Sequence, residues 1–450
     1  MPAITDWIFR VGYLLDGCGG VRSNQEVFIR AGKIAAILDT TDRSEDAEVT
    51  RRLFTDVKRV ELTDAVMLPG LINSHHHAYS ALARGIPINN VLSHFPAILA
   101  RLWWKLDRAL DEESIRLSAL LTARDAIQSG CTTIVDHHSS PSHIKGSLEL
   151  IRDKFAKFNL TGLLCYETTD RNGDAAFQDA VDENLRFVES SKDSSQCRGM
   201  LGLHAPFTLS DESLRRIAGI RPHDAPIHIH VAEDETDVKD AQRQGYGGPL
   251  ARLHKFGLLD ENSLIVHGVH LPPEDIALAR EIGVKLAHNP ESNCNNHVGY
   301  ADPSRFKDEQ VLLGTDGMTS NMLYSLRFTE MQMTAQSPQR QKAMEWAKRM
   351  LFENPIRYLS AMLGRTVGRI ETGLPADFAI FPYHAPTPLT KQNWIAHLVY
   401  GLGDHAQASW VFANGQPVLE AGVIPLIDEA ALDDAARQAA EKLWTRFSKL

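Results

Sequence analysis

The sequence predicts an α/β fold: a (β/α)8 TIM-type barrel with a small β-sandwich module formed from both chain ends. Three observations support this prediction: a length of 450 residues, β-rich segments at both ends, and short apolar runs alternating with helical stretches between them. A large barrel plus an accessory module accounts for such a length. We expect the sandwich module at 1–64 and 366–427, the barrel at 65–365, and a C-terminal helix at 428–450.

The two chain ends share a pattern of short strands separated by turns. The first sixty-odd residues show strands and turns only, and the pattern returns near the other end, in the runs WIFRVGYLLDG, EVFIRAGKIAAIL, ADFAIFPY and ASWVFANGQPVLEAG. The Asn414-Gly415 pair in the last run is a strong signal for a two-residue hairpin. Beyond it, an Ala-rich amphipathic stretch predicts a helix over roughly 428–448.

Eight apolar runs in the middle of the chain are candidate parallel strands, each followed by a helical stretch. They cover 65–73, 131–136, 160–166, 199–204, 226–231, 263–268, 284–289 and 311–316. An open doubly wound sheet would give the same periodicity. The barrel is favoured because seven of the eight runs end in or next to His or Asp, and barrel enzymes place their active-site residues at the C-terminal ends of many strands.

Composition limits the class of partner and the compartment. The formal net charge of −10 argues against a nucleic-acid or anionic-membrane partner, so we expect a free small molecule as substrate. Five scattered cysteines without a CxxC pair are typical of a reducing cytosol. No export signal and no long apolar stretch is visible, so we expect a cytoplasmic protein, and by base rate a homodimer.

The segment LPGLINSHHHAYSALARG contains the sharpest local signal. Alternate side chains of a strand share a face, so His75 and His77 point together while His76 points away. Two imidazoles at one strand end can bind one metal ion. For this pair alone, a polar histidine cluster at a strand–loop junction is an equally good interpretation.

Two further strand ends supply the remaining candidates. In IHIHVAEDE, His230 adds a third imidazole and Glu233 a carboxylate suited to proton transfer, while His228 is interpreted as a hydrogen-bonded interior residue one layer deeper. Asp316, at the end of the last run, would by itself be interpreted as a helix cap. Together with three histidines it becomes a carboxylate ligand, and a His3Asp set with an open position is typical of a catalytic metal site.

The order of these motifs resembles the amidohydrolase superfamily. HxH at 75–77, HxxE at 230–233, then IVHGVHL, AHNPESN and GTDG are similar to its mononuclear cytosine/guanine deaminase and triazine hydrolase branch. LPGLIN, GLHAPFTLSD and GRIETGLPADFAIF extend the resemblance over nearly the whole chain. Finer details, such as VDHHSSP and CYETTDRNG, resemble the SsnA-type aminohydrolases.

The resemblance implies a role for each candidate. His75, His77, His230 and Asp316 would hold one Zn²⁺ or Fe²⁺, and Asp316 would also act as the base for the attacking water. Glu233 would pass protons to the ring nitrogen and the leaving amine. His267 would contact the water at the metal. The implied reaction is hydrolytic deamination, with release of ammonia from a purine-, pterin- or pyrimidine-like heterocycle.

Three residues are candidates for the substrate side. Dinuclear relatives carry a lysine where this chain has His204, and this difference argues against a dinuclear site. In the deaminase branch the same position faces the substrate, so the resemblance implies that His204 donates a hydrogen bond to the ring. A histidine that only packs at the strand end is an equal alternative. His137 follows the second strand on the same face. Trp104, in the long segment 84–110 after the first strand, would stack on a planar ring, although the core of a short helix or a subunit interface is slightly favoured for it.

Two other functions remain open at this point. A hydrolase that removes an alkylamine or a halide from a triazine-like ring would use almost the same site. A catalytically inactive scaffold would keep the fold, but such a relative is free to lose the ligands, and this chain has all four together with Glu233 and His267.

Overall fold

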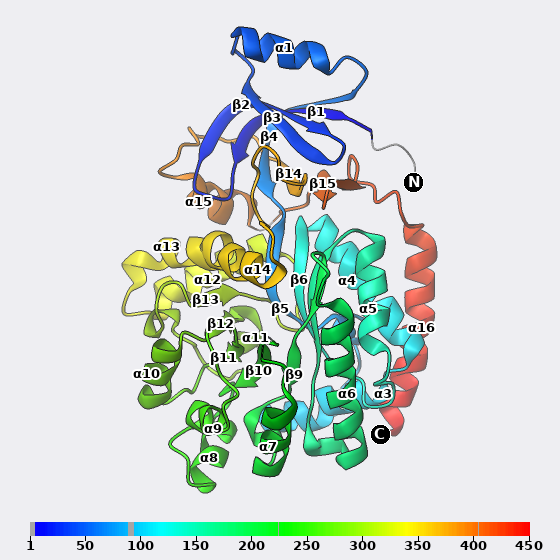
Figure 1. The fold of residues 1–450 in the computed structure, drawn as a ribbon, viewed down its shortest axis with the longest axis vertical. Coiled ribbons are helices and arrows are strands. Elements are labelled where there is room, and N and C mark those ends of the chain that lie inside the picture. The colour runs from blue at the N-terminus through cyan, green and yellow to red at the C-terminus, as the bar shows by residue number, and fades with distance from the viewer. Residues whose placement is uncertain (1–4, 89–93, 224, 404) are drawn as a thin grey trace.

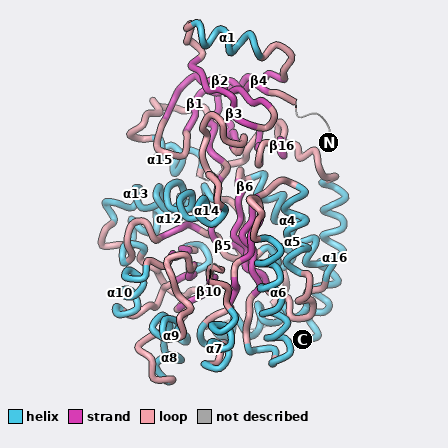
Figure 2. Tube along the Cα trace, in the orientation of Figure 1, coloured by secondary structure: helices cyan, strands magenta, loops and turns pink. Residues whose placement is uncertain are grey.

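The computed structural model describes residues 5–88, 94–223, 225–403 and 405–450. A β-sheet built from both chain ends lies at one end of the molecule, and parallel strands surrounded by helices make up the rest (Figures 1 and 2). The chain therefore has the α/β character that the sequence predicts.

The sheet of the chain ends has seven strands in the order β16-β15-β14-β4-β1-β2-β3. These are β1 (Trp7–Leu15), β2 (Val21–Arg30), β3 (Lys33–Asp39), β4 (Lys58–Pro69), β14 (Phe378–Pro382), β15 (Trp410–Ala413) and β16 (Gln416–Leu419). Strands β1 and β4 pair in parallel and the other neighbours are antiparallel. Between β15 and β16, Asn414 and Gly415 both have positive φ, 46° and 84°, so the predicted two-residue hairpin is confirmed.

One element of this end of the chain was predicted wrongly. Where the sequence predicted only strands and turns, residues Glu45–Leu53 form helix α1 (Figure 1). The Ser44 side chain caps the helix by accepting a hydrogen bond from the Ala47 amide, and three acidic residues occupy the first turn. Phe54, just after the helix, packs on Phe28 of the sheet with ring centroids 5.0 Å apart.

The parallel strands form two sheets. One contains β5 (Leu71–His76), β6 (Cys131–His138), β7 (Thr161–Tyr166) and β8 (Cys197–Gly199); the other contains β9 (Leu201–Leu203), β10 (Ile227–Val231), β11 (Leu264–His267), β12 (Lys285–His288) and β13 (Val311–Leu313). Isolated parallel bridges join the two sheets, His76 to Asp316 and Thr168 to Leu203. All eight predicted runs are strands, and their C-terminal ends face the same way.

Two of the predicted runs are each divided between two strands. The first run passes from β4 to β5 at Gly70, where an added Cβ would lie 2.0 Å from Thr132 Oγ1 and 2.1 Å from Asp377 Oδ1. Only glycine allows this close approach, so the chain crosses there from one sheet to the other. The fourth run divides at Met200, because β8 pairs with β7 while β9 pairs with β10.

Helices follow the parallel strands and cover them on the outside (Figure 2). They include α4 (Glu112–Gln128), α5 (Ser147–Lys157), α6 (Asp174–Ser191), α7 (Asp211–Ile220), α8 (Glu235–Arg243), α9 (Pro249–Lys255), α10 (Pro273–Ile282), α11 (Pro290–Asn295), α12 (Met322–Gln336), α13 (Ala343–Lys348) and α14 (Asn354–Leu363). Among the described residues, no helix is both long and apolar enough to cross a bilayer.

The long segment between β5 and α4 contains short helices, in agreement with the short-helix interpretation that the sequence slightly favoured for Trp104. It contains α2 (Phe95–Ile98), a π-helical turn η2 (Leu99–Trp103) and α3 (Trp104–Ala109), while residues 89–93 lie outside the described residues. The C-terminal helix α16 (Glu429–Lys449) packs beside it: Trp444 Nε1 donates to the Leu82 carbonyl and Arg446 Nε donates to the Ala109 carbonyl. The sequence predicted this helix, and its two hydrogen bonds hold the segment between β5 and α4 in place.

A buried arginine holds the short segment that follows β9. Arg252 of α9 is fully buried, and it donates to the carbonyls of Pro206 and Leu209, both at 2.7 Å, and to Asp211 Oδ1 at 2.9 Å. Three differently directed bonds need the planar guanidinium, because a lysine ammonium cannot reach all three acceptors.

We therefore expect Arg252→Lys to lower the free energy of unfolding by about 3 kcal/mol, since buried carbonyls lose their partners. Denaturant unfolding of the variant measures this loss. The control is Arg215→Lys on the exposed face of α7, which should change the free energy by less than about 0.5 kcal/mol. Equal stability of both variants would show that Arg252 does not hold this segment.

Candidate metal centre and active-site cavity

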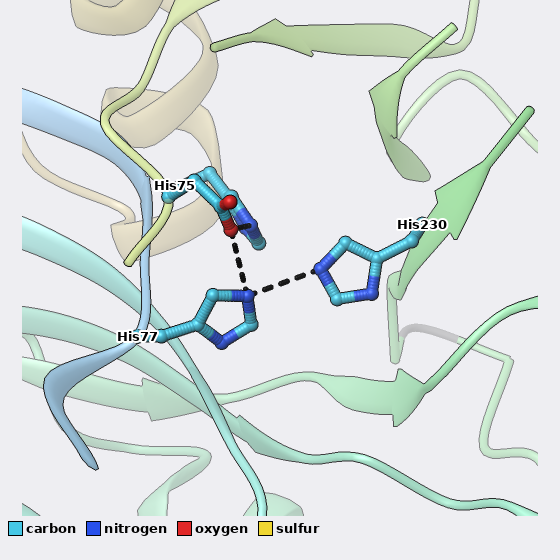
Figure 3. A group of neighbouring side chains, drawn as sticks. His75, His77 and His230 are labelled. Carbon is cyan, nitrogen blue, oxygen red and sulfur yellow. Dashed lines mark hydrogen bonds and ion pairs between the residues drawn. The ribbon is translucent and has the colours of Figure 1, made fainter. Parts of the chain in front are cut away.

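Three histidines and one aspartate meet where the parallel strands end. His75 and His77 come from the end of β5, His230 from β10, and Asp316 from just after β13; their ligand atoms all lie within 4.8 Å of one another. Figure 3 shows the three imidazoles turned toward a common centre. The histidines are buried and the Asp316 side chain is 14% exposed, so the group faces a cavity rather than bulk solvent.

The outer ring nitrogens of this group fix the protonation of the inner ones. His77 Nδ1 donates to the His137 carbonyl at 2.5 Å, and His230 Nδ1 donates to the His204 carbonyl at 2.9 Å. Because a carbonyl can only accept, both Nδ1 atoms carry a proton. Although burial opposes it, the charge of Asp316 raises the pKa of His77 to about 9, so a cation is favoured at this position. In the neutral rings both Nε2 atoms present lone pairs, 3.2 Å apart.

Such an arrangement of lone pairs is repulsive unless a cation lies between them. Asp316 Oδ1 adds negative charge, at 2.9 Å from His77 Nε2 and 3.2 Å from His75 Nε2. A proton can bridge only one pair of these atoms, whereas a divalent ion satisfies all four. The donor set therefore fits a metal ion, with the outer hydrogen bonds that orient metal-binding imidazoles already in place.

Two neighbouring histidines, His228 and His76, lie where the alternation of side chains along a strand predicts. His228 lies one layer below and its Nε2 is 2.9 Å from His75 Nδ1, so it is hydrogen-bonded in the interior. His76 points to the other side, where its Nδ1 is 3.0 Å from Thr315 Oγ1. Burial lowers the pKa of His76 to about 4, so this ring is neutral.

Glu233 and His267 form a proton-holding pair beside the four ligands. His267 Nδ1 bonds Asn293 Oδ1 at 2.8 Å, which leaves its Nε2 facing Glu233 Oε2 at 3.4 Å. Burial, and then the negative charge of Asp316, raise the pKa of Glu233 well above its usual value, while burial lowers the pKa of His267. Both directions favour a protonated carboxyl next to a neutral imidazole.

Two of these residues have a strained backbone. His267 has φ of +70° and Asp316 has φ of +54°, in the left-handed region that non-glycine residues rarely adopt. Each such residue costs on the order of 1–3 kcal/mol and persists where the surrounding structure enforces it, commonly at functional sites. Here the strain turns both side chains from the strand ends toward the metal-binding group.

A cavity opens above the group and has a mostly apolar wall. The empty space between its walls is about 770 Å³, a volume that includes open solvent. Of the residues predicted on the substrate side, His204 and Trp104 line it, with ring centroids 6.3 Å apart. Trp104 begins helix α3, so the helix and the cavity interpretations both apply to it. His137 is fully buried behind His77 and His230 and is not among the lining residues, so the structure does not bring it to the substrate side.

Two buried carboxylates of the cavity are absent from the sequence-based site. Glu167 follows β7, and its Oε1 is 3.2 Å from His137 Nδ1; although burial raises its pKa, that hydrogen bond and nearby histidine charges hold the pKa well below its usual value. A carboxylate directly after the run 160–166 was the available signal. Asp107 belongs to α3 and accepts from Arg171 at 3.1 Å. No motif or spacing marks it in the sequence.

Comparisons with known proteins agree with this geometry. Residues 66–418 match the family model described as "Amidohydrolase family". A 5'-deoxyadenosine deaminase of Methanosphaera stadtmanae is 27% identical, over 91% of this chain and 96% of its own length. A 5-methylthioadenosine/S-adenosylhomocysteine deaminase of Desulfitobacterium hafniense is 30% identical, over 82% and 84%. A crystal structure of a zinc-bound adenosine deaminase from Xanthomonas campestris superimposes with a TM-score of 0.81 at 22% identity, covering 99% of this chain and all of the other.

Proposed function

The chain belongs to the amidohydrolase family, and on that premise we propose that it is a metal-dependent hydrolytic deaminase of a purine-like ring. The observation that carries the proposal is the convergence of His75, His77, His230 and Asp316 beside Glu233, a buried carboxyl that faces His267. In the reaction, the oxygen of water bonds to the ring carbon that bears the amino group. The carbon–nitrogen bond then breaks, the ring keeps a carbonyl, and ammonia leaves.

Each polar residue has a defined task in this proposal. When bound, a divalent metal supplies Lewis acidity that lowers the pKa of water toward ~7 and so provides a nucleophile at neutral pH. Asp316 accepts the proton of the attacking water on its carboxylate. Glu233 donates the proton that it holds to the ring nitrogen, takes the proton of the added hydroxyl and passes it to the leaving amine; the proton on Asp316 then restores Glu233. His267, oriented by Asn293, contacts the attacking water through Nε2, where it can accept a hydrogen bond.

The substrate-side residues favour a flat, hydrogen-bonding ring. Trp104 offers an aromatic face and His204 a ring nitrogen in the same cavity. His204 Nδ1 bonds Thr208 Oγ1 at 3.0 Å, which orients the imidazole. Because two relatives are named for deaminating adenine nucleosides, we take the adenine ring as the substrate class. Zn²⁺ is the favoured metal, with Fe²⁺ as the alternative.

Ammonia release tests the proposal directly. We expect release from adenosine, 5'-deoxyadenosine or 5'-methylthioadenosine, with the ultraviolet shift of an adenine converted to a hypoxanthine. Guanine, cytosine and a chlorinated triazine complete the panel. Chloride release from the triazine without ammonia from any purine would instead support a hydrolase with another leaving group.

Metal removal gives a second expected outcome. Dialysis against a strong chelator should abolish ammonia release, and one equivalent of Zn²⁺ or Fe²⁺ should restore it, because the four ligands lie at the ends of three strands, β5, β10 and β13, that the sheets hold in place. Elemental analysis before and after dialysis measures the metal. A purified protein with less than roughly 0.2 equivalents and no gain on metal addition would point to an inactive scaffold.

We also infer the architecture around this site. The two parallel sheets, bridged at both edges, would close into one (β/α)8 barrel over residues 65–365, and the sheet of the chain ends would fold into a β-sandwich from 1–64 and 366–427. The helix within 428–450 would form a separate element. A homodimer remains the expected assembly.

A further inference from the structure

The active-site cavity is acidic. Its lining includes six carboxylic residues, Asp107, Glu167, Glu233, Asp234, Asp237 and Asp316, and within the described part of the chain no lysine or arginine lines it. A divalent ion held by the His3Asp group would offset two of these charges. The proton favoured on Glu233 removes a third charge, Arg171 offsets that of Asp107, and burial raises the pKa of Asp237 to about 7, so the remaining balance is weakly negative. An anion entering the cavity therefore meets no cation of the described lining except the metal.

Most of these carboxylates are already engaged by the protein. Asp237 accepts from the amides of Phe207 and Ala232, Asp234 caps helix α8 by accepting from Thr236, and Glu233 bonds Asn296. Their oxygens are occupied with structural or catalytic bonds. They therefore offer few free acceptors to a ligand.

Asp107 is different, because one of its oxygens has no partner. The residue is 2% exposed, its Oδ2 accepts from Arg171 at 3.1 Å and from Ser139 at 3.3 Å, and its Oδ1 is buried without a hydrogen bond. An unsatisfied buried carboxylate oxygen costs about 1–3 kcal/mol or more. In a residue that lines a ligand cavity, that cost is recovered when a donor on the ligand arrives.

The neighbouring guanidinium of Arg171 is not available to bind an anionic group of a substrate in this arrangement. The guanidinium of Arg171 is paired with the carboxylate of Asp107, and it stacks on the Trp104 ring at 4.7 Å from the centroid. Arg171 is not among the residues that line the cavity. Asp107 thus neutralises the guanidinium, and its unpaired Oδ1 belongs to a residue that lines the cavity.

We propose that this cavity selects substrates without negative charge, through a hydrogen bond from a substrate hydroxyl or amino group to Asp107 Oδ1. The inference rests on the proposed deamination of adenine nucleosides and narrows it: neutral or cationic nucleosides are accepted, and those with a carboxylate or phosphate are rejected. Phe95, Leu99, Trp103 and Phe207 on the surrounding wall fit the uncharged remainder of such a substrate.

A matched pair of ligands isolates the charge. S-adenosylhomocysteine and its methyl ester differ in one carboxylate, and adenosine and its 5'-monophosphate differ in one phosphate. We expect kcat/KM to be at least ~10-fold higher for the uncharged or cationic member of each pair, the effect of one unfavourable charge contact. Equilibrium binding to the slow Glu233→Gln variant, measured by calorimetry, should show the same order.

Two variants identify the residue. Asp107→Asn removes the acceptor charge and frees the Arg171 guanidinium, so the preference should fall by ~10-fold or reverse, with the neutral nucleoside losing and the anionic one gaining. Asp234→Asn removes the same charge from the same cavity while keeping the helix cap, because asparagine caps as well as aspartate. It should shift the preference much less.

The possible results distinguish failure of the charge selection from failure of the proposed deamination. Deamination of both members of each pair at equal kcat/KM would overturn the selection and leave the deaminase assignment intact. A preference that Asp107→Asn leaves unchanged would overturn the role of Asp107. Absence of both turnover and binding for every nucleoside would overturn the adenine substrate class and this inference with it.

Discussion

Replacing Asp316 with asparagine should lower kcat/KM for deamination by at least ~10³-fold, because one change removes both a metal ligand and the base for the attacking water. The carboxylate contacts His75 and His77 on one oxygen and accepts a short hydrogen bond from the Ser292 hydroxyl on the other. An asparagine oxygen carries no full charge and takes up no proton. The remaining histidines would hold the metal more weakly, which elemental analysis of the variant should show.

Asp428→Asn is the matched control. Asp428 caps helix α16 by accepting from the Ala431 amide, and asparagine can do the same. This variant should keep full activity and full metal content. Activity of Asp316→Asn within about tenfold of the unmodified enzyme would exclude Asp316 as the base.

Replacing Glu233 with glutamine should cost ~10²-fold or more in kcat while metal content stays unchanged, since proton transfer of this kind contributes 10²–10⁴-fold. Glutamine keeps the shape and the contact with Asn296 but cannot deliver a proton. Exposed Glu235, two residues on and paired with Lys239, provides the control Glu235→Gln, which should be silent.

A change of leaving group makes this test specific. Chloride needs no proton to leave, so a 6-chloropurine nucleoside should lose less activity in Glu233→Gln than the amino substrate does. Equal losses would place Glu233 in ring protonation alone. Near-normal activity toward the amino substrate would remove it from the mechanism.

The arrangement of the metal-binding group follows from rules that act locally along the sequence. Alternation of side chains on a strand puts His75 and His77 on one face, and the meeting of strand ends brings His230 and Asp316 to them. Neither relation depends on the conformation of the loops. For the same reason the strands themselves could be located from short apolar runs.

The parts that could not be predicted depend on contacts between distant segments. Asp107 becomes a cavity residue only because α3 packs against the segment of Arg171, and no periodicity records that contact. The crossing at Gly70 depends on the approach of Thr132 of β6 and of Asp377, which directly precedes β14. Helix α1 is a different case, since Ser44 and the acidic residues after it were a local signal outweighed by the β-rich runs around them.

The sheet shared by the two chain ends has a consequence for biosynthesis. Strand β4 ends at Pro69, whereas its antiparallel partner β14 begins only at Phe378. At a synthesis rate of 5–20 residues per second, the edge of β4 waits roughly 15–60 seconds for that partner on the ribosome. An unpaired edge is a template for aggregation during this interval. Completion of this sheet is therefore a late step for the nascent chain, followed by the docking of α16, and fragments that end before β14 would leave the ribosome with an open edge.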